Sequence, residues 1–440
     1  MENKLPRVLV ISSVDPYVGP GIVGLEHYNS LKEGGLEVDF LTKYPVVGHP
    51  EFISVYNKNP KNRFDKLIET IKSLCFRKFW NKLSHNPLTH QVPGHFFFYK
   101  KEIDPQVPVR LVISKITKKY DVVYIMFWQG LLTFATIDAI YDKLHCQFQF
   151  RCVDYSPMSG GCHFTGDCQR YQTGCGMCPG IRSDSEDDFT HWNVEYRRKV
   201  YEKVKPIVYG NTYMNSFYSK SFLLKDYDRC EIVLPLMDNN EYKPLDMTLC
   251  RQKHNIPLDK EFLIFIASQN LNDERKGISY LLQALKIFYS FLSVEERNKV
   301  LLVLAGHNIE PIKDSLYFDY SYLGYVKQTE LPEIYSMSNV YLSPSVNDAG
   351  PSMVNQSMSC GTPVVAFEMG TALDVVKGRN TGYCAKLRDS EDIARGISGI
   401  YHLPKHEYEA LRKHCREVAL ELTSQESHVR NFLRVYEKYK

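Results

Sequence analysis

Short apolar runs alternate with segments of helical periodicity along most of the chain. The runs expected to form strands are 7–13, 36–42, 121–127, 146–153, 206–211, 262–268, 299–306, 339–345 and 363–367. Runs that are apolar on both faces are typical of parallel strands covered by helices on each side. The strands form two series separated by the polar stretch 235–252. The pattern therefore predicts an α/β protein with two Rossmann-like, doubly wound domains, and it predicts that 235–252 is the linker.

Length and composition agree with two globular domains. The chain has 440 residues, of which 44% are hydrophobic and 24% are charged, and a chain of this length is too long for one average core. The longest apolar run, 122–128, is far shorter than the roughly 20 residues of a membrane-spanning helix. The first residues show no secretory signal pattern. We expect a cytoplasmic protein without a nucleic-acid partner.

The net charge of +3 hides a basic region near the N-terminus. Residues 51–119 contain 14 Lys or Arg and 5 Asp or Glu, a net charge of +9. Within this region, 62–83 has apolar residues at helical spacing surrounded by lysines and arginines. A basic amphipathic helix can bind an anionic membrane surface, and it can equally be a domain helix with a solvated basic face. Both readings stay open.

Two glycines in the turn after the first strand let the backbone approach a ligand. Gly19 and Gly21 lie in the string GPGIVG, which fits the G-x-G-x-x-G dinucleotide pattern literally. The string lies far from the end of the strand, and the acid of the second strand, Asp39, lies inside that strand instead of at its end. Nicotinamide binding is therefore a weak alternative.

The second series of strands carries a cationic turn and a polar loop before a short helix. Arg275, Lys276 and Gly277 precede a periodic apolar helix, where an anion such as a diphosphate would relieve the repulsion between the two cations. The segment 347–367, NDAGPSMVNQSMSCGTPVVAF, reads as a loop, a helix and a buried strand. Asp348 before that helix and Gln356 inside it can both bond sugar hydroxyls.

Together these segments resemble glycosyltransferase family 4, whose members are retaining enzymes with the GT-B fold. The resemblance covers most of the chain and is strongest over 262–385. It rests on Lys276-Gly277, on Asp348 and Gln356 before CGTPVV, and on the segments 324–345 and 368–384. The segment RCVDYSPMSGGCH matches a family segment that projects from the first domain. The fold implied is GT-B, with two Rossmann-like domains facing a central cleft.

The resemblance also implies roles for single residues. Lys276 and Asp348 would be the catalytic residues, with Lys276 and Arg275 neutralising the donor diphosphate. Trp128 and Asp154 would lie on the acceptor side. The full set expected to bind the donor is Gly19, Gly21, Arg275, Lys276, Tyr325, Asp348, Gly350, Pro351, Ser352, Met353 and Gln356.

Three positions depart from the family pattern. The usual pair of glutamates is replaced by Asp348 and Gln356, so the second position loses its charge. A histidine that commonly precedes the first-domain aspartate is replaced by Val153. An arginine that often follows the first strand of the second domain is absent, because Gln269 and Asn270 stand there.

Four of the twelve cysteines are clustered in sequence. Cys162, Cys168, Cys175 and Cys178 have the spacing C-x5-C-x6-C-x2-C. Four thiolates with a terminal C-x-x-C suit a tetrahedral, structural zinc ion. Reduced structural cysteines are the main alternative, and a redox pair or disulfides are a third. The transfer chemistry itself needs no cofactor, since Lys276, Arg275 and helix N-termini can neutralise the diphosphate.

The sequence therefore predicts a glycosyltransferase of hexosyl or related type. It would move a sugar from a nucleotide-diphosphate donor to a hydroxyl of a growing glycan, on a polysaccharide or lipid-linked oligosaccharide of the cell envelope. Residues 62–83 would give peripheral contact with the inner face of the membrane. The alternative is a non-catalytic homologue that binds nucleotide sugars. The expected domains are 1–240 for the acceptor, 241–422 for the donor, and 423–440 as a C-terminal helix packing back on the first domain.

Overall fold

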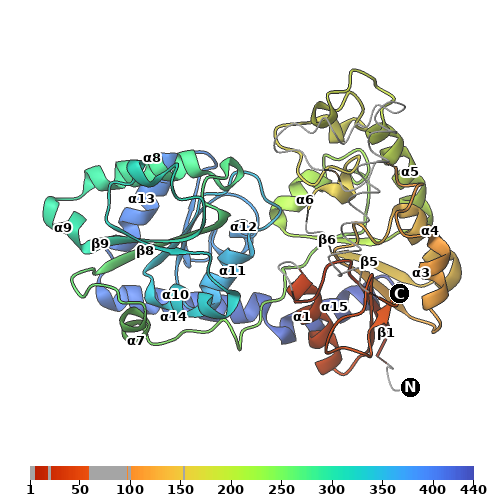
Figure 1. Cartoon of the computed structure of the whole chain (residues 1–440), viewed down its shortest axis with the longest axis horizontal. Coiled ribbons are helices and arrows are strands. Elements are labelled where there is room, and N and C mark those ends of the chain that lie inside the picture. The colour runs from red at the N-terminus through yellow and green to blue at the C-terminus, as the bar shows by residue number, and fades with distance from the viewer. Residues whose placement is uncertain (1–4, 18–20, 59–96, 98–100, 152–153) are drawn as a thin grey trace. The chain divides into compact units, whose positions relative to one another are not determined.

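The computed structural model describes residues 5–17, 21–58, 97, 101–151 and 154–440. The chain divides into two compact units, each with a sheet and covering helices (Figure 1). Unit 1 comprises Met1–Gly210, Asn215–Glu231 and Leu433–Lys440, and unit 2 comprises Asn211–Met214 and Ile232–Phe432.

Unit 1 contains a sheet with the strand order β3-β2-β1-β4-β5-β6-β7. Its strands are β1 (Arg7–Ile11), β2 (Glu37–Thr42), β3 (Ile53–Ser54), β4 (Val122–Ile125), β5 (Gln147–Arg151), β6 (Ile207–Gly210) and β7 (Cys230–Ile232). The pairs from β3 through β6 are parallel. The order 3-2-1-4 reverses direction between β1 and β4, as in doubly wound folds.

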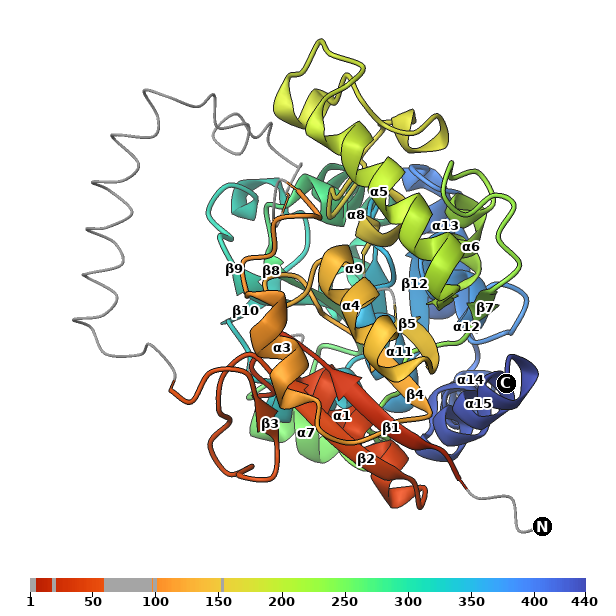
Figure 2. The same cartoon turned by 90° about the vertical axis from the view of Figure 1, so that its right-hand side faces the viewer.

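The helices of unit 1 are α1 (Gly21–Glu33), α3 (Val109–Lys115), α4 (Phe134–Leu144) and α5 (Phe189–Val204). Phe134, Ile137 and Ile140 recur at helical spacing on α4 and are buried. Figure 2 shows α3, α4 and α5 next to one another. The loop of 37 residues between β5 and α5 (152–188) contains only short 3-10 turns in its described part.

Unit 2 contains a parallel sheet with the order β10-β9-β8-β11-β12-β13. Its strands are β8 (Phe262–Asn270), β9 (Val300–His307), β10 (Tyr320–Gly324), β11 (Val340–Ser343), β12 (Val364–Phe367) and β13 (Gly382–Ala385). Alternate residues of β8 enter different cores: Ile264 and Ile266 pack on one face, and Leu263 and Phe265 on the other. The strand is apolar throughout because both faces are covered.

Helices cover both faces of this second sheet. Figure 1 shows α8 and α13 on one face and α10 and α14 on the other. The helices are α7 (Met247–Lys253), α8 (Ile278–Phe291), α9 (Val294–Lys299), α10 (Leu331–Met337), α11 (Ser352–Ser359), α12 (Ala372–Val375), α13 (Ser390–Tyr401) and α14 (Lys405–Thr423). Two further helices contain residues of both units, namely α6 (Thr212–Tyr218) and α15 (Gln425–Lys438).

The predicted α/β class with two doubly wound domains is confirmed, and every predicted strand is present. The stretch 235–252, which the sequence predicted to be the linker between the domains, lies inside unit 2 instead. It contains all but the last residue of α7, and Met237 and Tyr242 are buried in the core of that unit. The predicted basic helix 62–83 lies outside the described residues.

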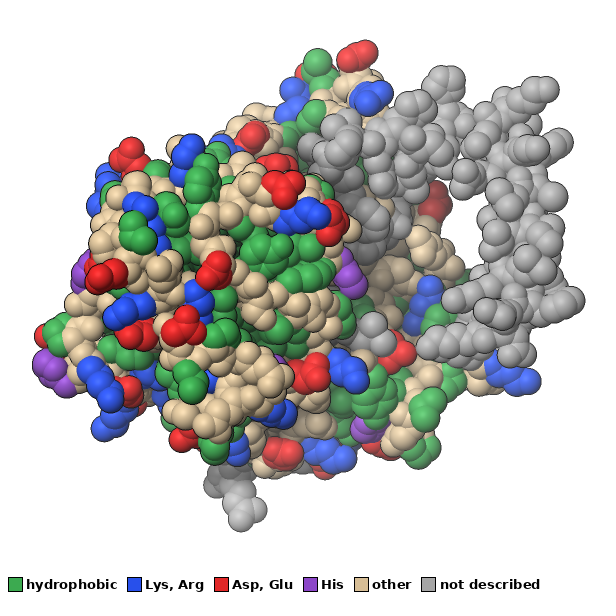
Figure 3. Space-filling model, turned by 60° about the vertical axis from the view of Figure 1, so that its left-hand side comes forward, with side chains coloured by type: hydrophobic (Ala, Val, Ile, Leu, Met, Phe, Trp, Pro, Cys, Tyr) green, Lys and Arg blue, Asp and Glu red, His purple; other side chains and the backbone are tan. Residues whose placement is uncertain are grey.

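The surface shows no simple charge pattern on the face turned to the viewer in Figure 3, where Lys and Arg alternate with Asp and Glu. In the described part of the chain, every helix is too short or too polar to span a bilayer.

Candidate functional site

Two loops meet where the strand order of unit 2 reverses direction. Because β8 and β11 are adjacent and parallel, the loops that follow them leave the same edge of the sheet. Lys276 lies in the first loop and Asp348 in the second, and Lys276 Nζ is 2.5 Å from Asp348 Oδ2. Both side chains are partly shielded, with exposures of 32% and 15%. In open parallel sheets this switch point is where ligands bind.

The backbones of these two loops are locked together. The Arg275 carbonyl accepts hydrogen bonds from the N–H groups of Val346 (2.9 Å) and Asn347 (3.3 Å). Gly277 has a φ of +74°, and a Cβ there would lie 1.8 Å from the Pro344 carbonyl oxygen. Only glycine permits this approach. The position of Lys276 is therefore fixed by contacts on both sides of it.

Asp348 is held in place by its own loop as well as by Lys276. Its Oδ1 accepts the Gly350 N–H at 3.0 Å. A lysine ammonium carries three N–H donors, and the contact with Asp348 uses one of them. The pair therefore presents a cation to the switch point, while the carboxylate partly neutralises it.

Helix α11 begins directly after this loop, with Pro351 at its N-cap position. The first N–H groups of a helix have no partner within it and carry partial positive charge. Ser352 and Met353 supply those groups here. The loop before them is anchored by Asn211, whose Nδ2 donates to the Ala349 carbonyl at 2.7 Å. Lys276 and the start of α11 thus present positive charge from two elements.

Arg275 has its own acid partner. Its Nη2 is 2.9 Å from Asp273 Oδ2. Together with the Lys276–Asp348 contact, this pair relieves the repulsion between the adjacent cations without any bound anion. Arg275 therefore lies beside the switch point, but the two adjacent cations do not by themselves require a diphosphate there.

Gln356 lies on α11 with a side chain already occupied by two tyrosines. Tyr335 Oη donates to its Oε1 (3.0 Å), and its Nε2 donates to Tyr242 Oη (3.1 Å). Gln356 is 7% exposed. Burial holds the pKa of the Tyr335 phenol well above its ordinary value, so that the hydroxyl remains a donor. This geometry gives Gln356 a role in positioning α11, and its direct contact with a ribose stays a prediction.

Tyr325 lies just after β10 and is 63% exposed. Its ring stacks on His307 at the end of β9, with the centroids 5.4 Å apart and the planes at 10°. His307 pairs in register with Asn270 at the end of β8. An exposed, flat ring at this edge of the sheet can stack on another planar group.

In unit 1, Gly21 is the first residue of α1, and a Cβ there would lie 1.9 Å from the Asp15 carbonyl oxygen. Its need for glycine is explained by this backbone contact. Gly19 and Val153 lie outside the described residues.

Trp128 and Asp154 are both buried in unit 1. The Trp128 ring is 1% exposed and packs on Phe150 at 5.7 Å between centroids, so the structure places it in the core. Asp154 accepts Ser156 N–H on Oδ1 (2.8 Å), and Gln129 Nε2 and His163 Nδ1 lie 3.0 and 2.7 Å from Oδ2. His163, whose side chain is 29% exposed, was not predicted as a site residue. Nothing in the sequence indicates that His163 contacts Asp154.

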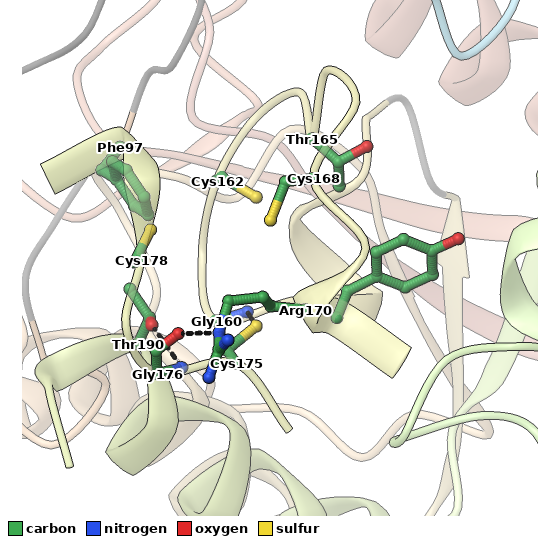
Figure 4. A pocket seen from close by; sticks show the side chains of 11 residues that line it. Phe97, Gly160, Cys162, Thr165, Cys168, Arg170, Cys175, Gly176, Cys178 and Thr190 are labelled. Atoms are coloured by element: carbon green, nitrogen blue, oxygen red, sulfur yellow. Dashed lines mark hydrogen bonds between the residues drawn. The ribbon is translucent and has the colours of Figure 1, made fainter. Parts of the chain in front are cut away.

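The four clustered cysteines line one cavity, together with Phe97 and Arg170 (Figure 4). All four are unpaired thiols. Burial raises the pKa of Cys162 to about 11 and that of Cys178 to about 12, and it also raises the pKa of Cys175. Among the described residues, no three His, Cys, Asp or Glu side chains are already grouped closely enough to hold a metal ion.

Comparison with known proteins finds a family match within unit 2. Residues 246–419 match the family model of glycosyl transferases group 1. This region is a group 1 glycosyltransferase domain. It contains Lys276, Asp348 and the whole of α11. The match does not distinguish family 4 from the rest of the group, so that finer assignment stays a prediction.

Solved structures show the fold of the whole chain. Sucrose-phosphate synthase from Thermosynechococcus elongatus is 17% identical, with a TM-score of 0.64 over 98% of this chain and 99% of that one. Anabaena HepE in complex with UDP-glucose is 13% identical, with a TM-score of 0.61 over 98% of this chain and 100% of that one. The chain has the GT-B fold.

One curated relative is an uncharacterized glycosyltransferase of Methanocaldococcus jannaschii. It is 22% identical over 274 residues, which are 59% of this chain and 66% of that protein. The match thus spans slightly less than two thirds of the relative.

We predict that Gly277→Ala destabilises the protein more than Gly378→Ala. Both glycines have positive φ angles, +74° and +71°, but the space around Gly378 is open within 4 Å. Gly378→Ala should cost only backbone strain, about 1–2 kcal/mol. Gly277→Ala adds the collision with Pro344, and thermal unfolding followed by circular dichroism should show a clearly larger fall in Tm. Equal losses would mean that the two loops are not in contact.

Gln356→Glu should be tolerated, because a carboxylate can accept from both tyrosine hydroxyls. Gln356→Leu should lower the free energy of unfolding by about 1–3 kcal/mol, since each of the two buried phenols loses its hydrogen bond with the amide. Denaturant titration of both variants measures this difference. If Gln356→Leu is as stable as the parent, the amide does not bind the tyrosines.

Proposed function

We propose that the protein transfers a sugar from a nucleotide-diphosphate sugar to a hydroxyl of a growing glycan, with retention of the anomeric configuration. The observation that carries the proposal is the meeting of Lys276, Asp348 and the start of α11 at the switch point of a group 1 glycosyltransferase domain. The glycan would belong to a polysaccharide or a lipid-linked oligosaccharide. The nature of this acceptor rests on the family resemblance.

The donor diphosphate would be held by positive charge from two sources. Lys276 can bond a phosphate oxygen through the ammonium N–H groups that do not bond Asp348. The backbone N–H groups of Ser352 and Met353 can bond another phosphate oxygen. Similarity to a fold that binds UDP-glucose in HepE supports a nucleotide sugar as the ligand class. Tyr325 would stack on the nucleotide base, and Gly350 and Pro351 would shape the loop around the sugar phosphate.

The chemical step would depend mainly on charge stabilisation. As the bond between the sugar C1 and the phosphate oxygen breaks, negative charge grows on the leaving diphosphate beside Lys276. The acceptor hydroxyl attacks C1 from the same face and passes its proton to the leaving phosphate oxygen, which accounts for retention. Asp348 is paired with Lys276, which suits it to orienting the lysine and a sugar hydroxyl. A preorganised hydrogen-bond donor of this kind typically lowers the activation free energy by about 3 kcal/mol.

On the acceptor side, the proposal assigns Asp154 to holding its loop. Its carboxylate accepts from Ser156 and Gln129 and contacts His163, so the partly exposed group that it positions is His163. Peripheral contact with a membrane through 62–83 remains part of the proposal for a lipid-linked acceptor.

We predict that Lys276→Ala lowers sugar transfer by roughly 100-fold while the fold survives, because the leaving group loses its nearest cation. Lys299→Ala is the matched control. Lys299 pairs with Glu261 at 3.1 Å, before strands β9 and β8 begin and so at the opposite edge of the same sheet.

The donor for this assay is found first by a thermal-shift screen of nucleotide sugars, since a ligand at a hundred times its Kd stabilises by about 2.7 kcal/mol. Transfer and donor hydrolysis are then followed with the best donor. Unchanged turnover in Lys276→Ala would reject the assignment of the site. Donor binding without transfer or hydrolysis in the parent protein would favour the non-catalytic homologue.

A further inference from the structure

The clustered cysteines occupy the long loop between β5 and α5 in unit 1. They come from three separate parts of that loop, at 162, 168 and 175–178, yet all four line the same cavity. Figure 4 shows the sulfurs of Cys162 and Cys168 pointing toward each other, with Cys175 and Cys178 at other sides of the opening. The fold of the loop therefore gathers thiols that the sequence spaces over 17 residues.

The cavity is only large enough for one ion or one water molecule. Its volume is about 20 Å³, and roughly 10–15 Å³ is enough to admit one water-sized particle. Apart from the four cysteines, its lining residues include Phe97 and Arg170. A space of this size has no room for an organic ligand, but it can hold one ion.

The backbone around the C-x-x-C end is bent to present its two cysteines. Four successive residues have left-handed φ angles: Gly174 (+100°), Cys175 (+60°), Gly176 (+81°) and Met177 (+41°). Such angles are unfavourable for Cys and Met and persist only where the surroundings impose them. Gly176 is also required by space, because a Cβ there would lie 2.1 Å from the Glu186 carbonyl oxygen.

This bent segment is tied to the rest of unit 1 by hydrogen bonds. Met177 N–H donates to the Ser185 carbonyl (2.7 Å), and Cys178 N–H donates to Asp188 Oδ2 (2.9 Å). The Gly160 N–H donates to Cys175 Sγ at 3.2 Å. A backbone donor aimed at sulfur stabilises a thiolate, and metal ligands are commonly supported by such outer contacts.

We propose that this loop binds one zinc ion through Cys162, Cys168, Cys175 and Cys178. Binding converts four thiols into four thiolates and releases four protons, with no change of oxidation state. The sulfurs would move inward to about 2.3 Å from the metal, since the side chains are not yet grouped as ligands in this structure. The resulting negative charge lies beside Arg170, whose Nε donates to the Gly176 carbonyl at 2.5 Å.

The zinc ion would be structural. Four protein thiolates leave no open position for a substrate, and closed sites of this kind stabilise folds that have little apolar core. The loop also carries His163, which contacts Asp154. Loss of the metal should therefore loosen this part of unit 1. The inference does not depend on the proposed function, because the metal content is measured without any activity assay.

Zinc is measured by elemental analysis of the full chain purified without chelators. We expect about one zinc per chain in the parent protein and less than about a tenth in Cys168→Ser. Cys230→Ser is the matched control and should keep its zinc, since Cys230 is a partly buried, unpaired thiol of unit 1 outside the cavity.

A second measurement covers the case in which Cys168→Ser fails to fold. Cobalt(II) supplied to the parent protein during expression should give the intense near-ultraviolet and visible bands of tetrahedral thiolate coordination. Less than about a tenth of an equivalent of zinc together with no such cobalt spectrum would overturn the proposal. So would a thiol titration showing disulfides among these four cysteines, or a Cys230→Ser variant that loses zinc as fully as Cys168→Ser.

Discussion

The parallel pairing of β8 with β11 is the constraint on which the candidate site depends. Parallel strands send their following loops out at the same edge, and the 3-2-1-4-5-6 order makes these two strands neighbours although 69 residues lie between the end of β8 and the start of β11. Gly277 lets the loops touch, and the Arg275 carbonyl bonds the second loop to the first. Lys276 and Asp348 then meet as a consequence of sheet topology. The chemistry proposed for unit 2 needs only that this cation and the start of α11 share one edge.

In unit 1, a buried ion pair fixes the start of the long loop between β5 and α5. Arg197 on α5 and Glu102 are both fully buried and paired, with Arg197 Nε 2.6 Å from Glu102 Oε1. Arg197 Nη1 also donates to the carbonyls of Ser156 and Ser159, and Glu102 Oε2 accepts the Phe134 N–H. Removing one partner of such a pair typically costs about 3–5 kcal/mol, because a charge stays buried without compensation. This network fixes the start of the long loop that carries His163 and the cysteines.

The sequence predicted the fold well because strands apolar on both faces have few alternatives to a covered parallel sheet. It missed β3, β7, β10 and β13, which are short or, like β10 with its partly exposed tyrosines, carry no continuous apolar run. Lys276 and Asp348 were found because motif and strand order point to the same edge. Partners distant in sequence were not predictable. Nothing near Gln356 in the sequence indicates that it bonds Tyr242 and Tyr335. Likewise, nothing near Trp128 indicates that its ring packs on Phe150. The acids that pair with Arg275 and Lys276 are Asp273 and Asp348, and the sequence alone does not indicate these pairings.

We propose that Lys276 at the switch point of unit 2 recognises the second phosphate of a nucleotide diphosphate. The most direct test is calorimetric binding of nucleoside diphosphates and the matching monophosphates, for uridine, guanosine and adenosine, to the parent protein and to Lys276→Met. We expect the parent to bind one diphosphate at least about tenfold more tightly than its monophosphate, and Lys276→Met to lose most of this preference. A preference that survives unchanged in Lys276→Met would show that Lys276 does not recognise the second phosphate.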